Sequence, residues 1–306
     1  MTPTQNSYSI GTPGQPWGDA EKAEWLSRQS KHRSYTDDVL NVIGRFRSDF
    51  DVVQYGQLDY GPNGQYQLFA VKNRNWQDEL PYILITGGVH GYETSGVHGA
   101  LRFIEQEALR YTKQANLLVV SCISPWAYEC IHRWNPHAVD PNRSFRDDSP
   151  AEESAALMRL IAPLRDRFLL HIDLHETTDS DETEFRPALA ARDGKKYEPG
   201  EIPDGFYLVG DTANPQLDFQ QAVIAAVARV THIAPADNNG EIIGSPVVAP
   251  GVILYAFREL GLCAGITNAR YTTTTEVYPD SAHTTPKQCI AAQVTAVNAA
   301  IDFVLT

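Results

Sequence analysis

The sequence has few cysteines, no long apolar run and a shortage of positive charge. Its four cysteines, Cys122, Cys130, Cys263 and Cys289, fall in no paired spacing among 306 residues. Such spacing argues against a disulfide framework or a thiolate zinc site and favours a reducing compartment. No apolar run approaches the roughly 20 residues that span a bilayer, and the first residues have no signal-peptide pattern. We therefore expect a cytoplasmic protein with no membrane partner.

Acidic residues outnumber basic ones by 38 to 25, which gives a formal net charge of -13. Binding to phosphate backbones depends on a positive surface field, so nucleic acid is not an expected partner. The length suffices for one large core, and no internal repeat or linker divides the chain. We predict a single domain over residues 1–306, with residues 1–17 as a candidate N-terminal extension.

The hydrophobic pattern alternates between the periods of strands and helices. Short apolar runs predict buried strands at residues 66–71, 82–86, 117–122 and 168–174. Helical periodicity occurs at residues 37–46, 94–109, 215–233 and 290–304, and residues 262–267 and 272–277 are rich in β-formers. A further helix is expected to start at Ser149, with Ser149 as its cap and Pro150 in its first turn. This order predicts an α/β fold of three layers, α/β/α, in which a mixed, mostly parallel sheet has helices on both faces.

In such sheets ligands bind beyond the carboxyl ends of the strands, so the residues after each apolar run are the candidates. The run at 82–86 is followed by Gly-Gly-Val-His90-Gly-Tyr-Glu93. A histidine and a glutamate three residues apart at the entrance of a helix can point at one zinc ion. The same spacing also occurs without function, so this motif alone leaves both interpretations open.

The run at 168–174 is followed by His175-Glu176-Thr177-Thr178. On a strand, His171, Asp173 and His175 share one face. His175, at the end of the strand, is a third candidate metal ligand, whereas His171 is interpreted as a hydrogen-bonded core residue. Asp173 either orients a ligand imidazole or caps a loop, and the sequence does not choose between these roles.

Two further segments contain polar residues that could take part in binding or catalysis. The loop Asp140-Pro-Asn142-Arg143 offers a guanidinium fork and an amide that can bind a carboxylate, or else form a surface ion pair. The β-branched run at 272–275 leads to Glu276, and a carboxylate on a buried strand needs a partner or a function. Beside a metal-bound water it could act as a general base.

Taken in order, the motifs H-G-Y-E, D-P-N-R, D-L-H-E and T-T-T-T-E-V-Y-P resemble those of the M14 family of zinc carboxypeptidases, over about residues 50 to 300. The resemblance implies one zinc ion held by His90, Glu93 and His175. It also implies that Glu276 is the general base of a hydrolase that cleaves a C-terminal peptide or peptide-like amide bond.

The same resemblance implies roles for five more residues. Asn142 and Arg143 would bind the terminal carboxylate of the substrate, and Arg133 would polarise the scissile carbonyl. Asp140 would orient the first histidine ligand, and Tyr255 would close over the substrate. Pro141 departs from the family, which usually has a small or aliphatic residue at this position.

A related branch, the succinylglutamate desuccinylases and aspartoacylases, has a second-histidine motif much like the one at His175. The alternative function is therefore zinc-dependent removal of the acyl group from an N-acyl amino acid. Either substrate would present a free carboxylate. A non-catalytic binding module would require a damaged ligand set, and the full set is present.

Two properties of the expected enzyme are left open by the sequence. The preferred C-terminal side chain depends on the pocket floor, which we expect within residues 240–270. Arg258 or Arg270 at that floor would favour acidic side chains, whereas either residue could instead be a solvated charge. The oligomeric state is the second open property.

Overall fold

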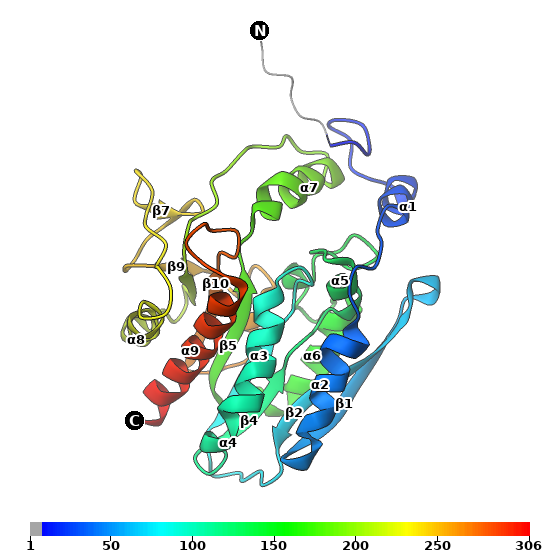
Figure 1. Ribbon diagram of the computed structural model, residues 1–306. Helices are drawn as coiled ribbons and strands as arrows, with labels where there is room; N and C mark the ends of the chain where they lie inside the picture. Colours follow the sequence, from blue (N-terminus) through cyan, green and yellow to red (C-terminus); the bar gives the residue numbers. More distant parts are fainter. Residues whose placement is uncertain (1–7) are drawn as a thin grey trace.

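The computed structural model describes residues 8–306, and its strands and helices alternate along the chain (Figure 1). The strands are β1 (Phe50–Asp59), β2 (Gln65–Asn73), β3 (Tyr82–Gly87), β4 (Asn116–Val120), β5 (Phe168–Glu176), β6 (Tyr207–Asp211), β7 (Glu241–Ile242), β8 (Ser245–Pro246), β9 (Val252–Tyr255) and β10 (Tyr271–Val277). The helices are α1 (Asp19–Ser27), α2 (Asn41–Arg45), α3 (Thr94–Gln106), α4 (Ala108–Tyr111), α5 (Pro125–Cys130), α6 (Glu152–Ile161), α7 (Arg186–Arg192), α8 (Leu217–Val227) and α9 (Pro286–Leu305).

Eight of the strands form one sheet in the order β1-β2-β4-β3-β5-β10-β6-β9. The four central strands, β4, β3, β5 and β10, run parallel to one another, as β6 and β9 do. The β1–β2, β2–β4 and β10–β6 pairs are antiparallel. The predicted α/β fold with a mixed, mostly parallel sheet is confirmed.

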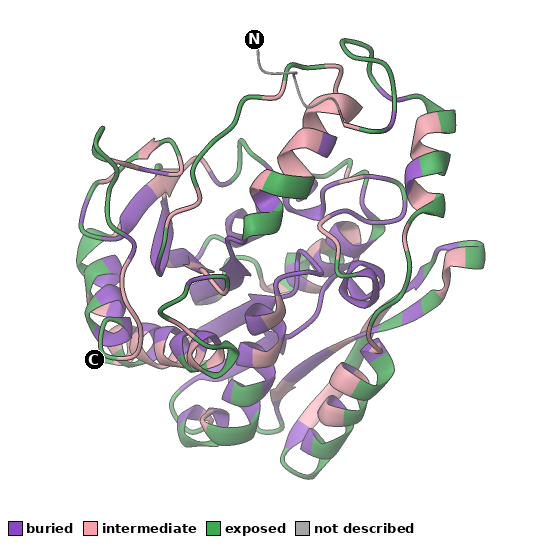
Figure 2. Ribbon diagram, turned by 45° about the horizontal axis from the view of Figure 1, so that its top comes forward, coloured by how far each residue is buried: buried purple, intermediate pink, exposed green. Residues whose placement is uncertain are grey.

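Apolar side chains cover both faces of the central strands. Ile83 and Ile85 of β3 belong to the same core cluster as Val97 and Leu101 of α3. Leu84, between them, belongs to the cluster that contains Leu157 of α6. Successive strand residues point to opposite faces, so α3 and α6 lie on opposite sides of the sheet. Figure 2 shows these central strands as buried and the outward faces of the surrounding helices as exposed.

Helix α9 runs along the sheet between α3 and α8 (Figure 1). Within residues 8–306 it is the one helix long and apolar enough to cross a membrane. Its side chains at Val297 and Ile301 are fully buried in the protein core. The apolar side chains on this face of α9 therefore pack in the protein core.

Residues 8–17, part of the candidate N-terminal extension, pack against the rest of the chain. Ile10 and Trp17 are buried, and the indole of Trp17 lies edge-on to that of Trp134, with ring centroids 6.2 Å apart. The backbone N–H of Trp17 donates a hydrogen bond to the carbonyl of Arg192. Residues 1–7 of the predicted extension lie outside the described residues.

Two local predictions are wrong. Helix α6 begins at Glu152 with Ala151 as its N-cap, whereas the Ser149 hydroxyl bonds the backbone of Ala151 and forms a turn before the helix. Residues 262–267, whose β-former content favours a strand, instead contain a 3-10 turn at Cys263–Gly265. The N–H of Cys263 donates to the side chain of Asn142 rather than to a neighbouring strand.

The predicted helices are present but their ends differ. Helix α3 ends at Gln106, where Glu107 leaves the helical region with φ -120°, before the short α4 continues the pattern. Helix α8 occupies 217–227 of the predicted 215–233, and the helix predicted at 37–46 opens with a π turn at Thr36–Leu40. Apolar periodicity continues into the flanking turns, which is why it overstates helix length.

The close approach of α3 to β5 generates a stability prediction. A Cβ added at Gly96 would lie 2.4 Å from the carbonyl oxygen of Leu174, whereas one added at Gly44 of α2 meets nothing within 4 Å. Gly96→Ala should lower the free energy of unfolding by about 1–3 kcal/mol through overpacking. Gly44→Ala should leave it unchanged or raise it by up to about 1 kcal/mol. Urea unfolding measures both, and equal effects would contradict the argument.

Candidate active site

The turn between β3 and α3 places two candidate ligands. Gly88 adopts a left-handed conformation with φ +62°, which lets the chain leave the strand sharply. At Gly91 a Cβ would lie 1.9 Å from the carbonyl carbon of Ala127, so only glycine fits against α5. The turn ends at Glu93, the residue before α3. His90 and Glu93 are thereby held on one short loop at the carboxyl edge of the sheet.

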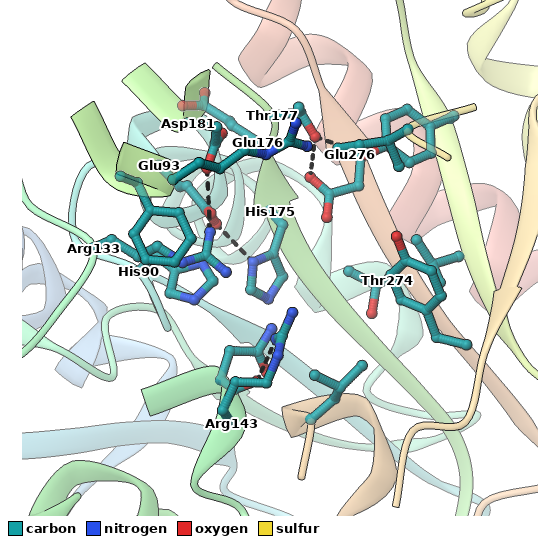
Figure 3. Close-up of a pocket in the computed structure, with 18 residues that line it drawn as sticks. His90, Glu93, Arg133, Arg143, His175, Glu176, Thr177, Asp181, Thr274 and Glu276 are labelled. Atoms are coloured by element: carbon teal, nitrogen blue, oxygen red, sulfur yellow. Dashed lines mark hydrogen bonds and ion pairs between the residues drawn. The ribbon is translucent and has the colours of Figure 1, made fainter. Parts of the chain in front are cut away.

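The side chains of His90, Glu93 and His175 converge, with one ligand atom from each within 4.8 Å of the others. The Nδ1 atoms of His90 and His175 lie 2.6 and 2.7 Å from the two oxygens of the Glu93 carboxylate. All three residues are buried, and Figure 3 shows them pointing toward one another beside the pocket. The structure brings together the three predicted metal ligands.

Two carboxylates hold the outer nitrogens of these imidazoles. Asp140 Oδ1 lies 3.0 Å from His90 Nε2, and Asp173 Oδ2 lies 2.7 Å from His175 Nε2. Such contacts fix the orientation of a metal-binding imidazole, so both Nδ1 atoms face Glu93. Asp173 therefore contacts a candidate ligand rather than capping a loop. His171 lies deeper in β5 and bonds the hydroxyl of Thr86, as expected of a core histidine.

The donor set fits a divalent metal ion. Two imidazole nitrogens and a carboxylate oxygen are ligands that zinc prefers. Glu93 Oε2 is buried and has no well-directed hydrogen-bond donor. Burial would raise the pKa of the Glu93 carboxyl, but the two neighbouring imidazoles hold it well below its usual range. A metal ion would satisfy this charged oxygen directly.

Strand register places Glu276 beside the ligand cluster. On the adjacent parallel strands, Glu276 of β10 is paired with His175 of β5. The hydroxyl of Thr177 donates a hydrogen bond of 2.9 Å to Glu276 Oε2. Burial raises the pKa of Glu276 to about 8, against the opposing effect of His175. A cation between the ligands would lower that pKa again.

A short turn presents the candidate carboxylate-binding pair. Pro141 starts a 3-10 turn at Pro141–Arg143, and the Asp140 carboxylate accepts a hydrogen bond of 2.9 Å from the N–H of Asn142. The Asn142 side-chain oxygen accepts from Cys263 N at 2.8 Å, which fixes the amide. Arg143 and Asn142 both line the pocket, so Pro141 is compatible with the expected geometry.

Arg133 is held by acidic and aromatic groups at the same pocket. Its Nε donates to Asp140 Oδ2 at 3.0 Å, and its Nη1 donates to the hydroxyl of Tyr92 at 2.9 Å. Asp181 Oδ1 lies 3.3 Å from the same Nη1, and the guanidinium lies 4.2 Å from the ring centre of Phe185. The cation is thus fixed in place before any substrate enters.

The pocket has a volume of about 190 Å³. Its lining residues are His90, Glu93, Arg133, Asn142, Arg143, His175, Glu176, Thr177, Asp181, Phe185, Arg186, Tyr207, Val209, Ile243, Tyr255, Leu262, Thr274 and Glu276. All predicted site residues are among them except Asp140, which lies behind His90. Figure 3 shows Arg143 on one side of His175 and Glu276 on the other.

Neither arginine considered for the pocket floor lines the pocket. Arg258 donates to the carbonyl of Thr267 at 2.9 Å, and Arg270 lies over the ring of Tyr271. The floor position considered for them is wrong. Their partners, Thr267 and Tyr271, do not line the pocket either.

The sequence reasoning missed several residues that support the site. Glu93 occupies the N-cap position of α3 but its side chain is turned toward the imidazoles. The Glu176 carboxylate caps α3 in place of Glu93, because it accepts hydrogen bonds of 2.9 and 2.8 Å from the N–H groups of Thr94 and Ser95. Burial raises the pKa of Glu176 to about 7. Its place directly after His175 was the one available signal.

Residues 79–198 match the family model of the succinylglutamate desuccinylase/aspartoacylase catalytic domain. The predicted family resemblance is confirmed over this segment. No curated protein matches the chain significantly.

Solved structures share the fold at low sequence identity. A candidate metallopeptidase from Shewanella amazonensis is 19% identical, with a TM-score of 0.64 over 90% of this chain and 99% of that one. Carboxypeptidase A from Helicoverpa armigera is 13% identical, with a TM-score of 0.57 over 99% and 77%. A metallo-carboxypeptidase from Pseudomonas aeruginosa, in complex with (2-guanidinoethylmercapto)succinic acid, is 14% identical, with a TM-score of 0.57 over 95% and 70%. The chain therefore has a carboxypeptidase-like fold.

The Asp173–His175 contact generates a metal-binding prediction. Asp173→Asn replaces the carboxylate that orients His175 and should weaken zinc affinity about 10–100-fold. Asp147→Asn, at an exposed position, should leave the affinity unchanged. Competition with a chromophoric chelator measures both dissociation constants. Equal affinities in the two variants would show that Asp173 does not orient a ligand.

Proposed function

We propose that this protein is a zinc-dependent carboxypeptidase that hydrolyses an amide bond next to a free carboxylate. The observation that carries the proposal is a single pocket lined by the His90–Glu93–His175 cluster, Glu276 and Arg143. It combines a candidate metal site, a base and a cation for the substrate's carboxylate. The carboxypeptidase-like fold supports this assignment.

Each residue has a definable task in the reaction. Zinc bound by His90, Glu93 and His175 would supply Lewis acidity toward the carbonyl oxygen and acidify water at neutral pH. Glu276 takes a proton from the attacking water and returns it to the leaving amine. Arg133 donates to the carbonyl oxygen as negative charge develops there. Because its position is already fixed, that donor contributes roughly 3–4 kcal/mol of transition-state stabilisation.

Arg143 and Asn142 would hold the substrate's free carboxylate. A guanidinium fork binds a carboxylate with two parallel hydrogen bonds. Substrates without that group would lose these two charge-assisted hydrogen bonds and bind more weakly. The succinic acid derivative bound by the Pseudomonas carboxypeptidase supports a carboxylate-bearing substrate here.

The substrate side chain would meet an uncharged part of the pocket. Val209 and Thr274 are paired across β6 and β10, and Thr274 lies two residues before Glu276 on the same face. Ile243 and Leu262 also line the pocket. A charged side chain buried against these four residues would find no partner among them. The expected C-terminal residue of the substrate is therefore apolar.

A second candidate is deacylation of an N-acyl amino acid. The match of residues 79–198 to the desuccinylase/aspartoacylase family favours it, as does a pocket of only about 190 Å³. The same residues would catalyse either reaction. The two differ in the group on the far side of the scissile bond.

A substrate panel tests the proposal. Zinc-loaded protein should hydrolyse N-blocked dipeptides ending in Phe or Leu with kcat/KM at least about 10-fold above those ending in Lys or Glu. C-terminally amidated dipeptides serve as the control and should not be cleaved. Chromatography of the products measures the rates. Cleavage of N-acetyl or N-succinyl amino acids alone would establish the second candidate, and no cleavage of any member would contradict both.

Glu276→Gln separates the base from the metal ligands. The amide cannot accept the proton, so kcat should fall by about 10²–10⁴-fold while the zinc content stays at that of the wild type. Glu259→Gln, at an exposed position, is the control and should change neither. Steady-state kinetics and metal analysis give the two readouts. Unchanged turnover would remove Glu276 from the base role, and lost zinc would make it a ligand.

A further inference from the structure

Arg33 lies against the loop that bears His90 and Glu93, although it belongs to the segment between α1 and α2. Its Nη2 donates to the carbonyl of Gly91, within that loop. Its Nη1 donates to the hydroxyl of Thr94, the first residue of α3, at 2.8 Å. Its Nε donates to the carbonyl of Tyr128 in α5 at 2.6 Å. One guanidinium therefore joins the loop, α3 and α5.

An aromatic ring supports the same guanidinium. The Arg33 Cζ lies 3.7 Å from the ring centre of Tyr128, a cation–π arrangement. A planar fork that is stacked and makes three hydrogen bonds has little freedom to move. Arg33 is partly buried, so these bonds are shielded from solvent.

The loop needs support from outside itself because its internal bonding is weak. Its one internal backbone bond, from the N–H of Glu93 to the carbonyl of His90, is 3.4 Å long. A further bond of 3.2 Å joins the N–H of Tyr92 to the carbonyl of His132. Both are longer than the usual 2.9–3.0 Å. Shorter contacts come from outside the loop: the Ser124 hydroxyl donates to the carbonyl of Val89 at 2.6 Å near its start, and Arg33 donates to Gly91 and Thr94 near its end.

The backbone around Arg33 is itself anchored to α5. The N–H of His32 donates to the carbonyl of Glu129 at 2.8 Å, and the N–H of Tyr35 donates to the Glu129 carboxylate at 3.1 Å. That carboxylate also accepts from the hydroxyl of Tyr66 in β2 at 2.8 Å. Arg33 thus extends from a fixed base toward the loop.

We propose that Arg33 is a positioning residue for the metal centre. It holds the Gly91 carbonyl and the start of α3 so that His90 and Glu93 meet His175 at ligand distance. This inference rests on the metal site of the proposed function. Arg33 itself touches none of the three candidate ligand side chains.

Arg33→Met tests the proposal by removing the donors while keeping a long side chain. The zinc dissociation constant should rise about 10–100-fold, as for other groups that orient ligands. Arg33→Lys should give a smaller loss, because a single ammonium cannot serve all three acceptors. Arg28→Met is the matched control, since Arg28 is exposed and its guanidinium donates to Ser9 and Glu24, away from the loop. Chelator competition gives the constants.

Hydrogen exchange in the metal-free protein gives an independent readout. Amides of residues 90–95 should exchange faster in Arg33→Met than in the wild type or Arg28→Met, with other regions unchanged. Wild-type zinc affinity and wild-type exchange in a folded Arg33→Met protein would overturn the proposal. If wild-type protein binds no zinc, the proposed function fails, and the exchange comparison still tests the support of the loop.

Thr94→Val provides a second route if Arg33→Met does not fold. It removes one acceptor of Arg33 and leaves the guanidinium in place. The zinc dissociation constant should rise about 2–10-fold, because the bond from Arg33 to Thr94 and the weaker bond from Thr94 to the carbonyl of Tyr92 are both lost. An unchanged constant and unchanged exchange at residues 90–95 would overturn the proposal.

Discussion

The structure around this site depends on one buried charge, the Glu93 carboxylate between two imidazoles. A buried carboxylate is costly unless it is paired. Here Asp140 and Asp173 add two more carboxylates behind the imidazoles, and the Arg133 guanidinium donates to one of them, Asp140. Negative charge therefore accumulates on the inner and outer sides of both rings. A divalent cation between the Nδ1 atoms would balance it, which links the folding of this region to metal binding.

The sheet determines which groups surround that charge. Because β3, β5 and β10 are parallel neighbours, their carboxyl ends meet at one edge. His175 and Glu276 lie opposite each other in register, and a shift of one residue would turn Glu276 to the other face. The loop from β3 then needs only to reach the same edge. Its glycines allow the approach to α5, and Arg33 and Glu176 hold the end that leads into α3.

The site residues whose positions depend on local spacing could be predicted from the sequence. His90, Glu93, His175 and Glu276 each follow or end an apolar run, so their common edge could be inferred. Glu176, Asp181 and Arg33 act through contacts between distant segments. No local pattern marks Asp181 or Arg33, and Glu176 is marked only by its place after His175. The wrong prediction around Cys263 also comes from a contact between distant segments. The turn at Cys263 depends on the amide of Asn142, more than a hundred residues earlier, and β-former content does not include that contact.

The residues of the proposed site come from two parts of the chain. The segment that matches the desuccinylase/aspartoacylase family, residues 79–198, contains the candidate ligands, Arg133 and the carboxylate-binding pair. These groups would be common to peptide and acyl-amide hydrolysis. Val209, Ile243, Leu262 and Thr274 all come from the part after it. Substitution among these four residues would change the preferred side chain while the metal, the base and the carboxylate clamp stayed intact, so the reaction and its selectivity can vary independently.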